Sequence, residues 1–309
     1  MTSKKVLITG SQGNIGKAME RVSENYDCEL YGCDCLHLNK KHYQRADIGE
    51  YREIEECVKK FRPEIIVNLA GEFGRANGED YYEKLWKTNA VGTKNLTILQ
   101  KEYNFRLVHA SSSEVYGDYD GLMRESVMDE FPIKQLNDYA ISKWVNELQL
   151  RNSILKDQAD TIIFRIFNTY GPGELFNQYR SAVSRFIHCC LCEEPYNVFT
   201  GHERTHTYID DCARMIFEIS LRGKKGEVYN IAGRDRTTMV KINEMIEKIC
   251  CSKSPYRKII NEKEPFTTAI KTVSNEKFLN LVGDFQFTPL EVGLNNTIKW
   301  YKNYLQTND

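Results

Sequence analysis

The chain has 309 residues and a formal net charge of −1, from 42 basic and 43 acidic side chains. This length suits a large α/β domain with a smaller attachment, and the balanced charge excludes a global field that would attract nucleic acid or an anionic membrane. No apolar run approaches the roughly 18–20 residues of a membrane span, and the N-terminus has no signal-peptide pattern, so we expect a cytoplasmic protein. The ten cysteines form no paired C-x-x-C motifs, and with the six histidines they make no metal-ligand spacing, so we expect reduced thiols and no metal.

A strand, a glycine turn and a helix follow one another at the start of the chain. Residues 5–9 are a short apolar run that ends at Gly10, and Gly13 and Gly16 follow before a segment with helical periodicity. A dinucleotide fingerprint requires this context, because the glycines let a pyrophosphate approach the backbone at a helix N-terminus. The spacing here is G-x-x-G-x-x-G.

Two acidic positions downstream strengthen the dinucleotide interpretation. A second strand, residues 29–33, ends at Asp34, whose carboxylate can bind both ribose hydroxyls and would repel a 2′-phosphate; this favours NAD over NADP. Asp47 precedes an acidic helix at residues 50–61. Asp47 can hold an adenine edge, or it can be a solvated helix N-cap.

The next strand, residues 64–71, is apolar and ends in small residues. Residues 72–78 are polar and punctuated by glycine, so we expect a loop at the carboxyl end of that strand, where open α/β sheets bind ligands. Glu72 and Arg75 in this loop either touch substrate or belong to a surface loop. A long helix is expected over residues 81–103.

The polar groups around which the chain is organised lie between residues 109 and 143. A hydroxyl cluster and a carboxylate follow the strand at residues 105–109. A helix then begins near Tyr139, so Tyr139 and Lys143 lie one turn apart on one face. An ammonium beside a phenol favours the phenolate, and we expect a pKa about three units below that of free tyrosine, which would make Tyr139 a base near neutral pH.

The second half of the chain mixes helices and strands. A strand is predicted over residues 161–167, with a sharp break at residues 168–173. Further strands are expected at 196–199 and 227–231, the latter returning to the main sheet, with helices at 181–192, 209–221, 241–249 and 290–305.

These elements predict an α/β fold. It consists of a Rossmann-type doubly wound parallel sheet with a smaller, interleaved C-terminal α/β substrate domain. We place the NAD-binding domain at residues 1–168, completed by about 207–231, and the substrate domain at residues 169–206 and 232–309.

In this order the motifs resemble those of the extended short-chain dehydrogenase/reductases that act on nucleotide sugars, the epimerase/dehydratase group. The resemblance covers nearly the whole chain. It rests on Gly10-x-x-Gly13-x-x-Gly16, Asp34, Asp47-Ile48, Asn68-Leu-Ala-Gly71, Asn89, Ser111-Ser-Ser-Glu-Val-Tyr-Gly117, Tyr139-x-x-x-Lys143, Arg165-Ile-Phe-Asn168-x-Tyr-Gly-Pro-Gly173, Arg204-x-x-x-Tyr208-Ile-Asp-Asp211 and Val228-Tyr-Asn-Ile231.

The resemblance implies a role for each matching residue. Tyr139 would take the proton of a sugar hydroxyl, Lys143 would lower its pKa and bind the nicotinamide ribose, and Ser112 would hydrogen-bond the same sugar oxygen. Asn168 and Arg204 would hold the diphosphate of a nucleotide-diphosphate sugar. The implied NAD-binding positions are Gly10, Gly13, Asn14, Ile15, Gly16, Asp34, Asp47, Ile48, Leu69, Ala70, Gly71, Asn89, Tyr139 and Lys143. The helices at residues 81–103 and 139–156 would pair with those of a second subunit as a four-helix bundle, giving a homodimer.

The resemblance implies a first step in which C4 of the sugar is oxidised by hydride transfer to NAD⁺. The segment of Ser112, Ser113 and Glu114 indicates which reaction follows this oxidation. In the 4,6-dehydratases that the chain resembles, a Glu at the position of Glu114 removes the C5 proton before water leaves from C6. We therefore expect a nucleotide-sugar 4,6-dehydratase with Ser112, Ser113, Glu114, Tyr139 and Lys143 as the catalytic group. Many dehydratases of the dTDP-glucose type have Asp where this chain has Ser113, whereas the GDP-mannose type and the UDP-glucuronate decarboxylases have Ser.

Three alternatives remain open. In a 4-epimerase, Glu114 would only brace its loop. A UDP-glucuronate-type decarboxylase comes third, because Ser142 replaces a usual glycine and residues 265–275 offer only Lys271 for the arginine that grips a carboxylate. A dinucleotide-binding regulator is the non-enzyme alternative, disfavoured because Tyr139 and Lys143 are both present. The sequence names neither the nucleotide base nor the sugar.

Overall fold

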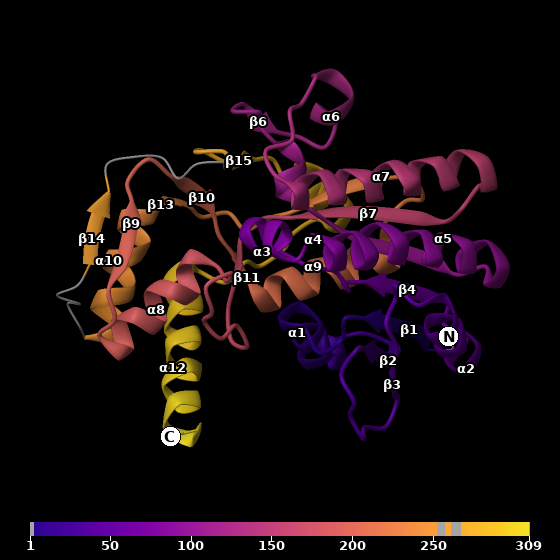
Figure 1. Cartoon of the computed structure of the whole chain (residues 1–309), viewed down its shortest axis with the longest axis horizontal. Coiled ribbons are helices and arrows are strands. Elements are labelled where there is room, and N and C mark those ends of the chain that lie inside the picture. The colour runs from indigo at the N-terminus through magenta and orange to yellow at the C-terminus, as the bar shows by residue number, and fades with distance from the viewer. Residues whose placement is uncertain (1–2, 252–256, 261–266, 309) are drawn as a thin grey trace.

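Seven parallel strands form the central sheet of the computed structural model, which describes residues 3–251, 257–260 and 267–308. The strand order is β12-β7-β5-β4-β1-β2-β3, and every neighbouring pair is parallel (Figure 1). The strands are β1 (Lys4–Thr9), β2 (Cys28–Asp34), β3 (Tyr43–Arg45), β4 (Ile65–Asn68), β5 (Arg106–Ser112), β7 (Thr161–Ile166) and β12 (Val228–Ile231). The predicted Rossmann-type sheet is confirmed, including the late return of β12 to its edge.

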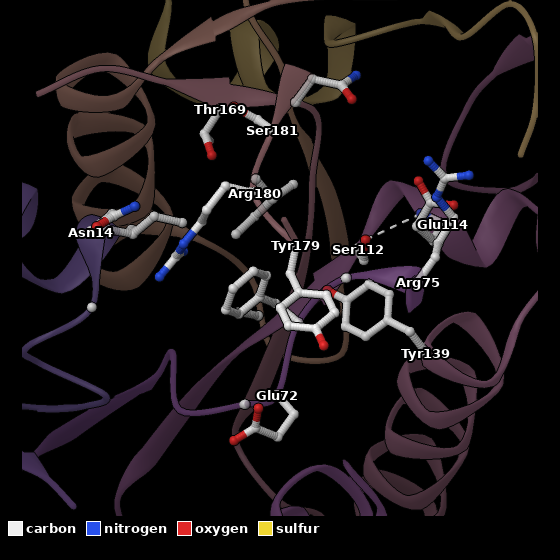
Figure 2. Close-up of a pocket in the computed structure, with 18 of the residues that line it drawn as sticks. Asn14, Glu72, Arg75, Ser112, Glu114, Tyr139, Thr169, Tyr179, Arg180 and Ser181 are labelled. Atoms are coloured by element: carbon white, nitrogen blue, oxygen red, sulfur yellow. Dashed lines mark hydrogen bonds between the residues drawn. The ribbon is translucent and has the colours of Figure 1, made fainter. Parts of the chain in front are cut away.

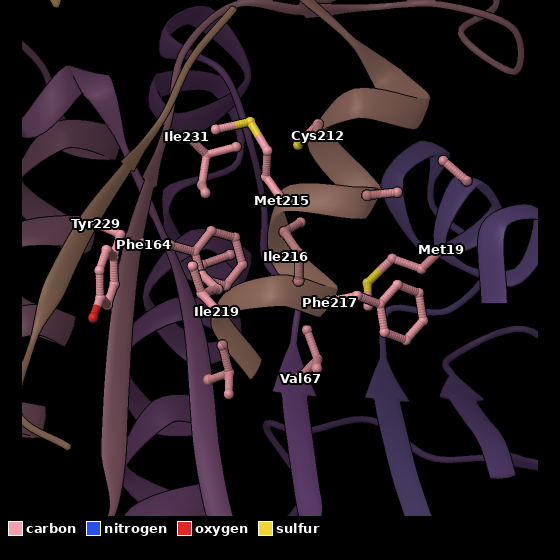
Figure 3. Packing of buried hydrophobic residues seen from close by; sticks show 14 of the residues in the cluster. Met19, Val67, Phe164, Cys212, Met215, Ile216, Phe217, Ile219, Tyr229 and Ile231 are labelled. Carbon is pink, nitrogen blue, oxygen red and sulfur yellow. The ribbon is translucent and has the colours of Figure 1, made fainter. Parts of the chain in front are cut away.

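Helices cover both faces of this sheet because its central strands are buried on both sides. On one face lie α1 (Asn14–Val22) and α9 (Ile209–Arg222), whose Met19 and Phe217 pack with Val67 and Phe164 of the sheet (Figure 3). On the other face lie α2 (Tyr51–Phe61), α5 (Gly92–Tyr103) and α7 (Asp138–Asp157). The two apolar clusters fix the strand ends that carry the polar residues described below.

A second group of elements lies beyond the carboxyl ends of the strands, on the left of Figure 1. Its helices α8 (Ala182–Cys192), α10 (Met239–Cys250) and α12 (Leu290–Asn308) share one apolar cluster with β9 (Tyr196–Phe199). Three two-stranded sheets support it: β9 with β14 (Arg257–Ile260), β10 (Glu203–Thr205) with β13 (Arg236–Thr238), and β8 (Thr169–Tyr170) with β11 (Thr207–Tyr208). The expected division of the chain into two domains at the residues given above stays a prediction.

A smaller layer joins the two groups near the end of β5. β6 (Leu122–Met123) pairs with β15 (Thr272–Val273), and a 3₁₀ turn (Ser113–Tyr116), α6 (Val127–Glu130) and α11 (Glu276–Val282) complete the described elements of this region. Tyr116, Met123 and Phe167 form its buried cluster. This pairing brings the chain just before β15 against the turn that follows β5.

One expectation for residues 72–103 needs correction, and the other is confirmed with a local irregularity. Residues 72–78 were expected to be a loop, but α3 (Arg75–Asp80) begins inside them, directly after Gly74 at a φ of 85°. The long helix is present as α4 (Tyr82–Trp86), a π-helical turn (Lys87–Val91) and α5. Short helices in polar, glycine-containing sequence lack the apolar period by which helices are recognised.

Within the described part of the chain, no helix combines the length and the apolar character that crossing a membrane requires.

Candidate active site

A cavity of about 1690 Å³ lies at the carboxyl ends of the strands, between the sheet and the second group of elements. Its walls include almost all of the positions predicted from the sequence. These are Gly10, Gly13, Asn14, Ile15, Gly16, Asp34, Asp47, Ile48, Leu69, Ala70, Gly71, Ser112, Ser113, Glu114, Tyr139, Asn168 and Arg204, together with Glu72 and Arg75. Asn89 and Lys143 are not among the lining residues.

The glycine turn gives one end of the cavity its shape. A Cβ on Gly10, which has a φ of 68°, would lie 2.7 Å from the Ala70 nitrogen, and a Cβ on Gly16 would lie 2.6 Å from the Ser11 oxygen. α1 begins at Asn14 with no side-chain hydrogen bond capping it, so the first amide groups of the helix face the cavity. Unsatisfied amides and the positive end of a helix dipole suit a diphosphate.

The two predicted carboxylates lie beside this turn. Oδ2 of Asp34 accepts a hydrogen bond from the Gln12 nitrogen at 2.9 Å, which holds the carboxylate at the end of β2. Oδ1 of Asp47 accepts from the Gly49 nitrogen at 2.8 Å, and Glu50, not Asp47, is the N-cap of α2. The N-cap alternative for Asp47 is therefore wrong, and its carboxylate stands in the cavity wall.

Asn89 and Lys143 lie directly behind Gly71. A Cβ on Gly71 would be 3.1 Å from both Asn89 Oδ1 and Lys143 Nζ. Asn89 accepts a hydrogen bond from the Glu72 nitrogen at 2.9 Å and donates one to Ser142 Oγ at 2.9 Å. Asn89 thus ties the end of β4 to α7 from behind the cavity wall.

The geometry around Tyr139 corrects one expectation. Burial raises the pKa of Tyr139 to about 12; its hydrogen bond with Ser112 lowers the pKa, and the charge of Glu114 raises it. Nζ of Lys143 donates to the Ala110 carbonyl at 3.0 Å and lies 5.9 Å from the centroid of the Tyr139 ring. The prediction that Lys143 lowers the pKa of Tyr139 is therefore wrong for this structure, in which burial itself lowers the pKa of Lys143 to about 8.

Glu114 lies in the cavity wall beside Tyr139 and Arg75 (Figure 2). Its carboxylate is ion-paired with the fully buried Lys271, which also donates to Ser113 Oγ at 3.3 Å. Burial raises the pKa of Glu114, but Lys271, Arg75 and Arg204 lower it, and the net pKa is below the ordinary value. Glu114 is thus a carboxylate at neutral pH with 19% of its side chain exposed.

A buried ion pair stabilises the end of β5, next to the segment from Ser112 to Glu114. Arg165 and Glu147 have fully buried side chains and make two hydrogen bonds of 2.9 and 2.8 Å. Ser111 Oγ donates to Glu147 at 2.6 Å, and Arg165 donates to Tyr116 Oη at 2.9 Å. The residues on either side of the segment from Ser112 to Glu114 are therefore held by one network.

Asn168 and Arg204, expected at the diphosphate, make contacts within the protein. Asn168 Nδ2 donates to the Thr205 carbonyl at 3.3 Å, and Arg204 Nη1 donates to the carbonyls of Glu203 and Ala269 at 2.9 and 2.5 Å. Arg204 Nη2 bonds with His202 and Thr267. Much of the donor capacity of Arg204 is thus used to join β10 to the chain before β15.

Two arginines that the sequence reasoning missed also line the cavity. Nε of Arg180 and Nε of Arg185 are buried with no hydrogen-bond partner among the described residues. The Arg180 guanidinium lies 4.2 Å from the centroid of the Phe73 ring and reaches between Asn14 and Tyr179 (Figure 2). Two arginines flanking the Ser181 N-cap of α8 were the available signal in the sequence.

Glu72 and Arg75 differ in their position. Glu72 forms an ion pair with Lys84 at 2.7 Å and lies below Tyr179 in Figure 2, away from Glu114. Arg75, from the first turn of α3, stands beside Glu114. Of the two, Arg75 is the one placed close to the predicted catalytic group.

The family model described as "NAD dependent epimerase/dehydratase family" matches residues 6–232, which carry the glycine turn, the carboxylates and the segments of Ser112 and Tyr139. The chain belongs to this family. It is an enzyme family whose members share the predicted extended short-chain dehydrogenase/reductase fold.

Relatives within the family carry different activities. The chain is 24% identical to the dTDP-glucose 4,6-dehydratase of Neisseria meningitidis serogroup B, over 96% of this chain and 93% of the relative. It is 25% identical to the UDP-N-acetyl-alpha-D-glucosaminuronate decarboxylase of Bacillus cytotoxicus, over 97% and 98%. The dTDP-glucose 4,6-dehydratase of Bacillus anthracis, solved in complex with NAD, superimposes with a TM-score of 0.84 at 22% identity, covering 98% of both chains.

NAD, the cofactor of the epimerase/dehydratase family, fits the residues along the cavity. Gly10 and Gly16 allow the tight turn, because a Cβ at either position would clash with the backbone of Ala70 or Ser11. The turn brings the N-terminus of α1 to the cavity wall, and the carboxylate of Asp34 favours a free ribose 2′-hydroxyl. Among the residues that the structure describes, no group of three or more His, Cys, Asp or Glu side chains could hold a metal ion.

Proposed function

We propose that this member of the epimerase/dehydratase family is a nucleotide-sugar 4,6-dehydratase. The observation that carries the proposal is the position of Glu114, a carboxylate in the cavity wall next to Tyr139. A ketone at C4 acidifies the hydrogen on C5, and a carboxylate within the same cavity can remove it. Dehydration then follows by loss of the C6 hydroxyl.

The other residues around Tyr139 serve the first step of this reaction. Tyr139 takes the O4 proton, and Ser112, hydrogen-bonded to Tyr139, orients the same oxygen. Bound NAD⁺ would supply the hydride acceptor for C4 and the hydride source for C6, and its positive charge would favour the phenolate of Tyr139. Lys143, reached through the gap left by Gly71, holds the nicotinamide ribose.

We assign the nucleotide diphosphate of the substrate to the part of the cavity that Arg180 and Arg185 line. Arg180 and Arg185 have buried Nε groups directed to no described partner, which is costly unless a ligand satisfies them. Asn168 and Arg204 complete this part, with Arg204 acting mainly as a brace. A phosphate oxygen is an acceptor that suits a guanidinium group.

The apolar faces of two helices support a homodimer. Val91 and Ile98 stand seven residues apart, as do Ile141, Leu148 and Leu155 of α7; all five are at least 36% exposed. Residues at such spacing share a face of each helix, and α5 packs against α7. The two helices would meet those of a second subunit as a four-helix bundle.

Mass spectrometry of reactions with UDP-, GDP-, dTDP- and CDP-sugars tests the proposal. Dehydration is expected as a product that has lost water from one of these sugars. Loss of carbon dioxide would indicate a decarboxylase instead, and an unchanged mass with an altered sugar would indicate a 4-epimerase. Tightly bound NAD without turnover of any of the sugars would indicate a dinucleotide-binding regulator.

The ion pair between Glu114 and Lys271 keeps 4-epimerisation as a second candidate, because a paired carboxylate can also be a brace. Replacement of Glu114 by Gln separates the two. In a dehydratase, the Glu114→Gln variant should still oxidise C4, but it should lose exchange of the C5 hydrogen with solvent and should stall before water loss, which is slowed about 100-fold or more. A 4-epimerase should keep most of its activity after the same change.

A further inference from the structure

Lys271 is a buried ammonium group that the proposed function has so far left without a role. It is fully buried, it lies just before β15, and its backbone is fixed by hydrogen bonds with Glu203 and Thr205. Its Nζ contacts two side chains of the cavity wall, the carboxylate of Glu114 and the hydroxyl of Ser113. Lys271 itself is not among the residues that line the cavity, so it can reach a substrate only through these two.

Water loss from C6 needs a proton donor as well as a base. Hydroxide is a poor leaving group, and a positioned acid accelerates such a departure by about 10²–10⁴. Tyr139 is engaged at O4 and Glu114 takes the C5 proton, so neither can supply a proton to the C6 oxygen at the same moment. Ser113 is in the cavity wall, but a serine hydroxyl alone is too weak an acid.

We infer that Lys271 supplies, through the hydroxyl of Ser113, the proton with which the C6 hydroxyl leaves as water. The inference rests on the proposed dehydration. In this inference Lys271 is a proton source that lies outside the cavity lining, and Ser113 is the group that contacts the substrate.

The charge interaction between Glu114 and Lys271 determines at which step Lys271 releases its proton. Burial lowers the pKa of Lys271, Glu114 raises it, and Arg204 and Arg75 lower it further. When Glu114 accepts the C5 proton its charge disappears, and with it the main interaction that holds the proton on Lys271. Lys271 therefore becomes a stronger acid at the step in which the C6 oxygen requires a proton.

The proton balance closes over one cycle. The C5–H bond breaks and its proton goes to Glu114, while its electron pair forms the C5=C6 bond. The C6–O bond breaks, and its electron pair leaves with the oxygen, which takes the hydroxyl proton of Ser113; Lys271 replaces that proton. Glu114 later returns its proton to C5. Water in the cavity carries the proton that Tyr139 took from O4 to Ser113, which passes a proton to the neutral Lys271.

Substrates with different leaving groups test this role. The probes are dTDP-glucose and dTDP-6-deoxy-6-fluoroglucose, or the UDP or GDP pair that the panel above selects, because fluoride leaves C6 without a proton. Lys271→Met should slow loss of water by about 100-fold or more but slow release of fluoride less than tenfold. A purely structural defect would slow both reactions alike, and that result would overturn the inference.

Lys271→Arg is the matched control, because arginine keeps the positive charge beside Glu114 but does not release a proton. It should be as defective as Lys271→Met with the hydroxyl substrate and nearly normal with the fluoro substrate. Full dehydration by Lys271→Arg would show that only the charge matters and would overturn the proposal.

Ser113→Ala provides a second variant in case the Lys271 variants do not fold. It leaves the ion pair between Lys271 and Glu114 in place and should show the same dependence on the leaving group. Normal dehydration by Ser113→Ala would refute the relay. The wild-type reaction keeps the two proposals apart, since a wild-type protein that dehydrates no sugar of the panel refutes the proposed function itself.

Discussion

The ammonium group of Lys143 borders the space that a side chain on Gly71 would occupy. A Cβ on Gly71 would stand 3.1 Å from Lys143 Nζ and 3.1 Å from Asn89 Oδ1, which is tighter than ordinary van der Waals contact. The absence of a side chain at the end of β4 is therefore what allows a lysine of α7 to approach the cavity from behind.

Replacement of Gly71 by Ala should displace the Lys143 ammonium by a few tenths of an ångström. We expect kcat to fall roughly tenfold, because small misplacements of catalytic groups are costly, with little change in the melting temperature. Steady-state kinetics with the sugar chosen by the panel, together with thermal unfolding, measures both. Unaltered kinetics in Gly71→Ala would show that Lys143 does not need this space.

Replacement of Lys143 by Met should abolish activity and stabilise the cofactor-free protein. The pKa of Lys143 falls from 10.5 to about 8 on folding, which corresponds to about 3 kcal/mol of destabilisation at pH 7. Loss of the bond to Ala110 offsets about 1 kcal/mol, so we expect a net gain of about 2 kcal/mol in the free energy of unfolding.

The pH dependence of that gain follows from the direction of the shift. Between pH 8 and 10.5 the unfolded chain binds more protons at Lys143 than the folded protein, so wild-type stability rises with pH in this window. The advantage of Lys143→Met, as measured by urea unfolding, should be complete below pH 8 and should shrink through this window until the lost bond to Ala110 outweighs it. Lys156→Met, at an exposed position in the last turn of the same helix, should show no such dependence.

Replacement of Tyr139 by Phe should lower kcat by about 10²–10⁴ with the fold and cofactor binding intact. Burial keeps the phenol of Tyr139 protonated, so the phenolate must be formed within the complex and its loss cannot be replaced by bulk base. Turnover at the wild-type rate would refute the assignment of the base. Replacement of the buried Tyr116, whose hydroxyl bonds with Asn230 and Arg165, should instead reduce stability.

Paired substitution of Leu148 and Leu155 by Glu should yield a monomer. These side chains are 49% and 77% exposed on one face of α7, and charges there cannot be buried against a second subunit without a large penalty. Sedimentation velocity compares the variant with wild type and with a Lys156→Glu control. A wild-type protein that sediments as a monomer would contradict the proposed four-helix bundle.

The sequence predicts the features of this fold that depend on local pattern. The strand, glycine turn and helix at Gly10 and the positions of Asp34 and Tyr139 in the cavity follow from short-range spacing and from the rule that ligands bind at the carboxyl ends of parallel strands. The partner of Glu114 could not be predicted in this way. Lys271 is 157 residues away in the chain, and it is brought there by long-range contacts, namely the pairing of β6 with β15 and the hydrogen bonds of its backbone with Glu203 and Thr205.

Side-chain direction explains the other differences. The spacing of Tyr139 and Lys143 correctly places both on one face of α7, but it cannot show that the ammonium turns to the Ala110 carbonyl. For the same reason, the Arg204 position matches a motif while its guanidinium is bonded to main-chain carbonyls of Glu203 and Ala269. Motif spacing fixes where a Cα lies, whereas the contacts of a long side chain depend on residues remote in sequence.

The π-helical turn at Lys87–Val91 changes which residues of the helix face the protein interior and which face outward. It lets Asn89 face inward to Glu72 and Ser142 while Val91 and Ile98 remain outside. A π-helical turn spans one residue more than an α-helical turn, so removal of one residue would restore regular α-helix and leave the helix beyond it nearly in register. A single codon deletion here should therefore disturb the inward contacts of Asn89 and leave the outer face with Val91 and Ile98 in place.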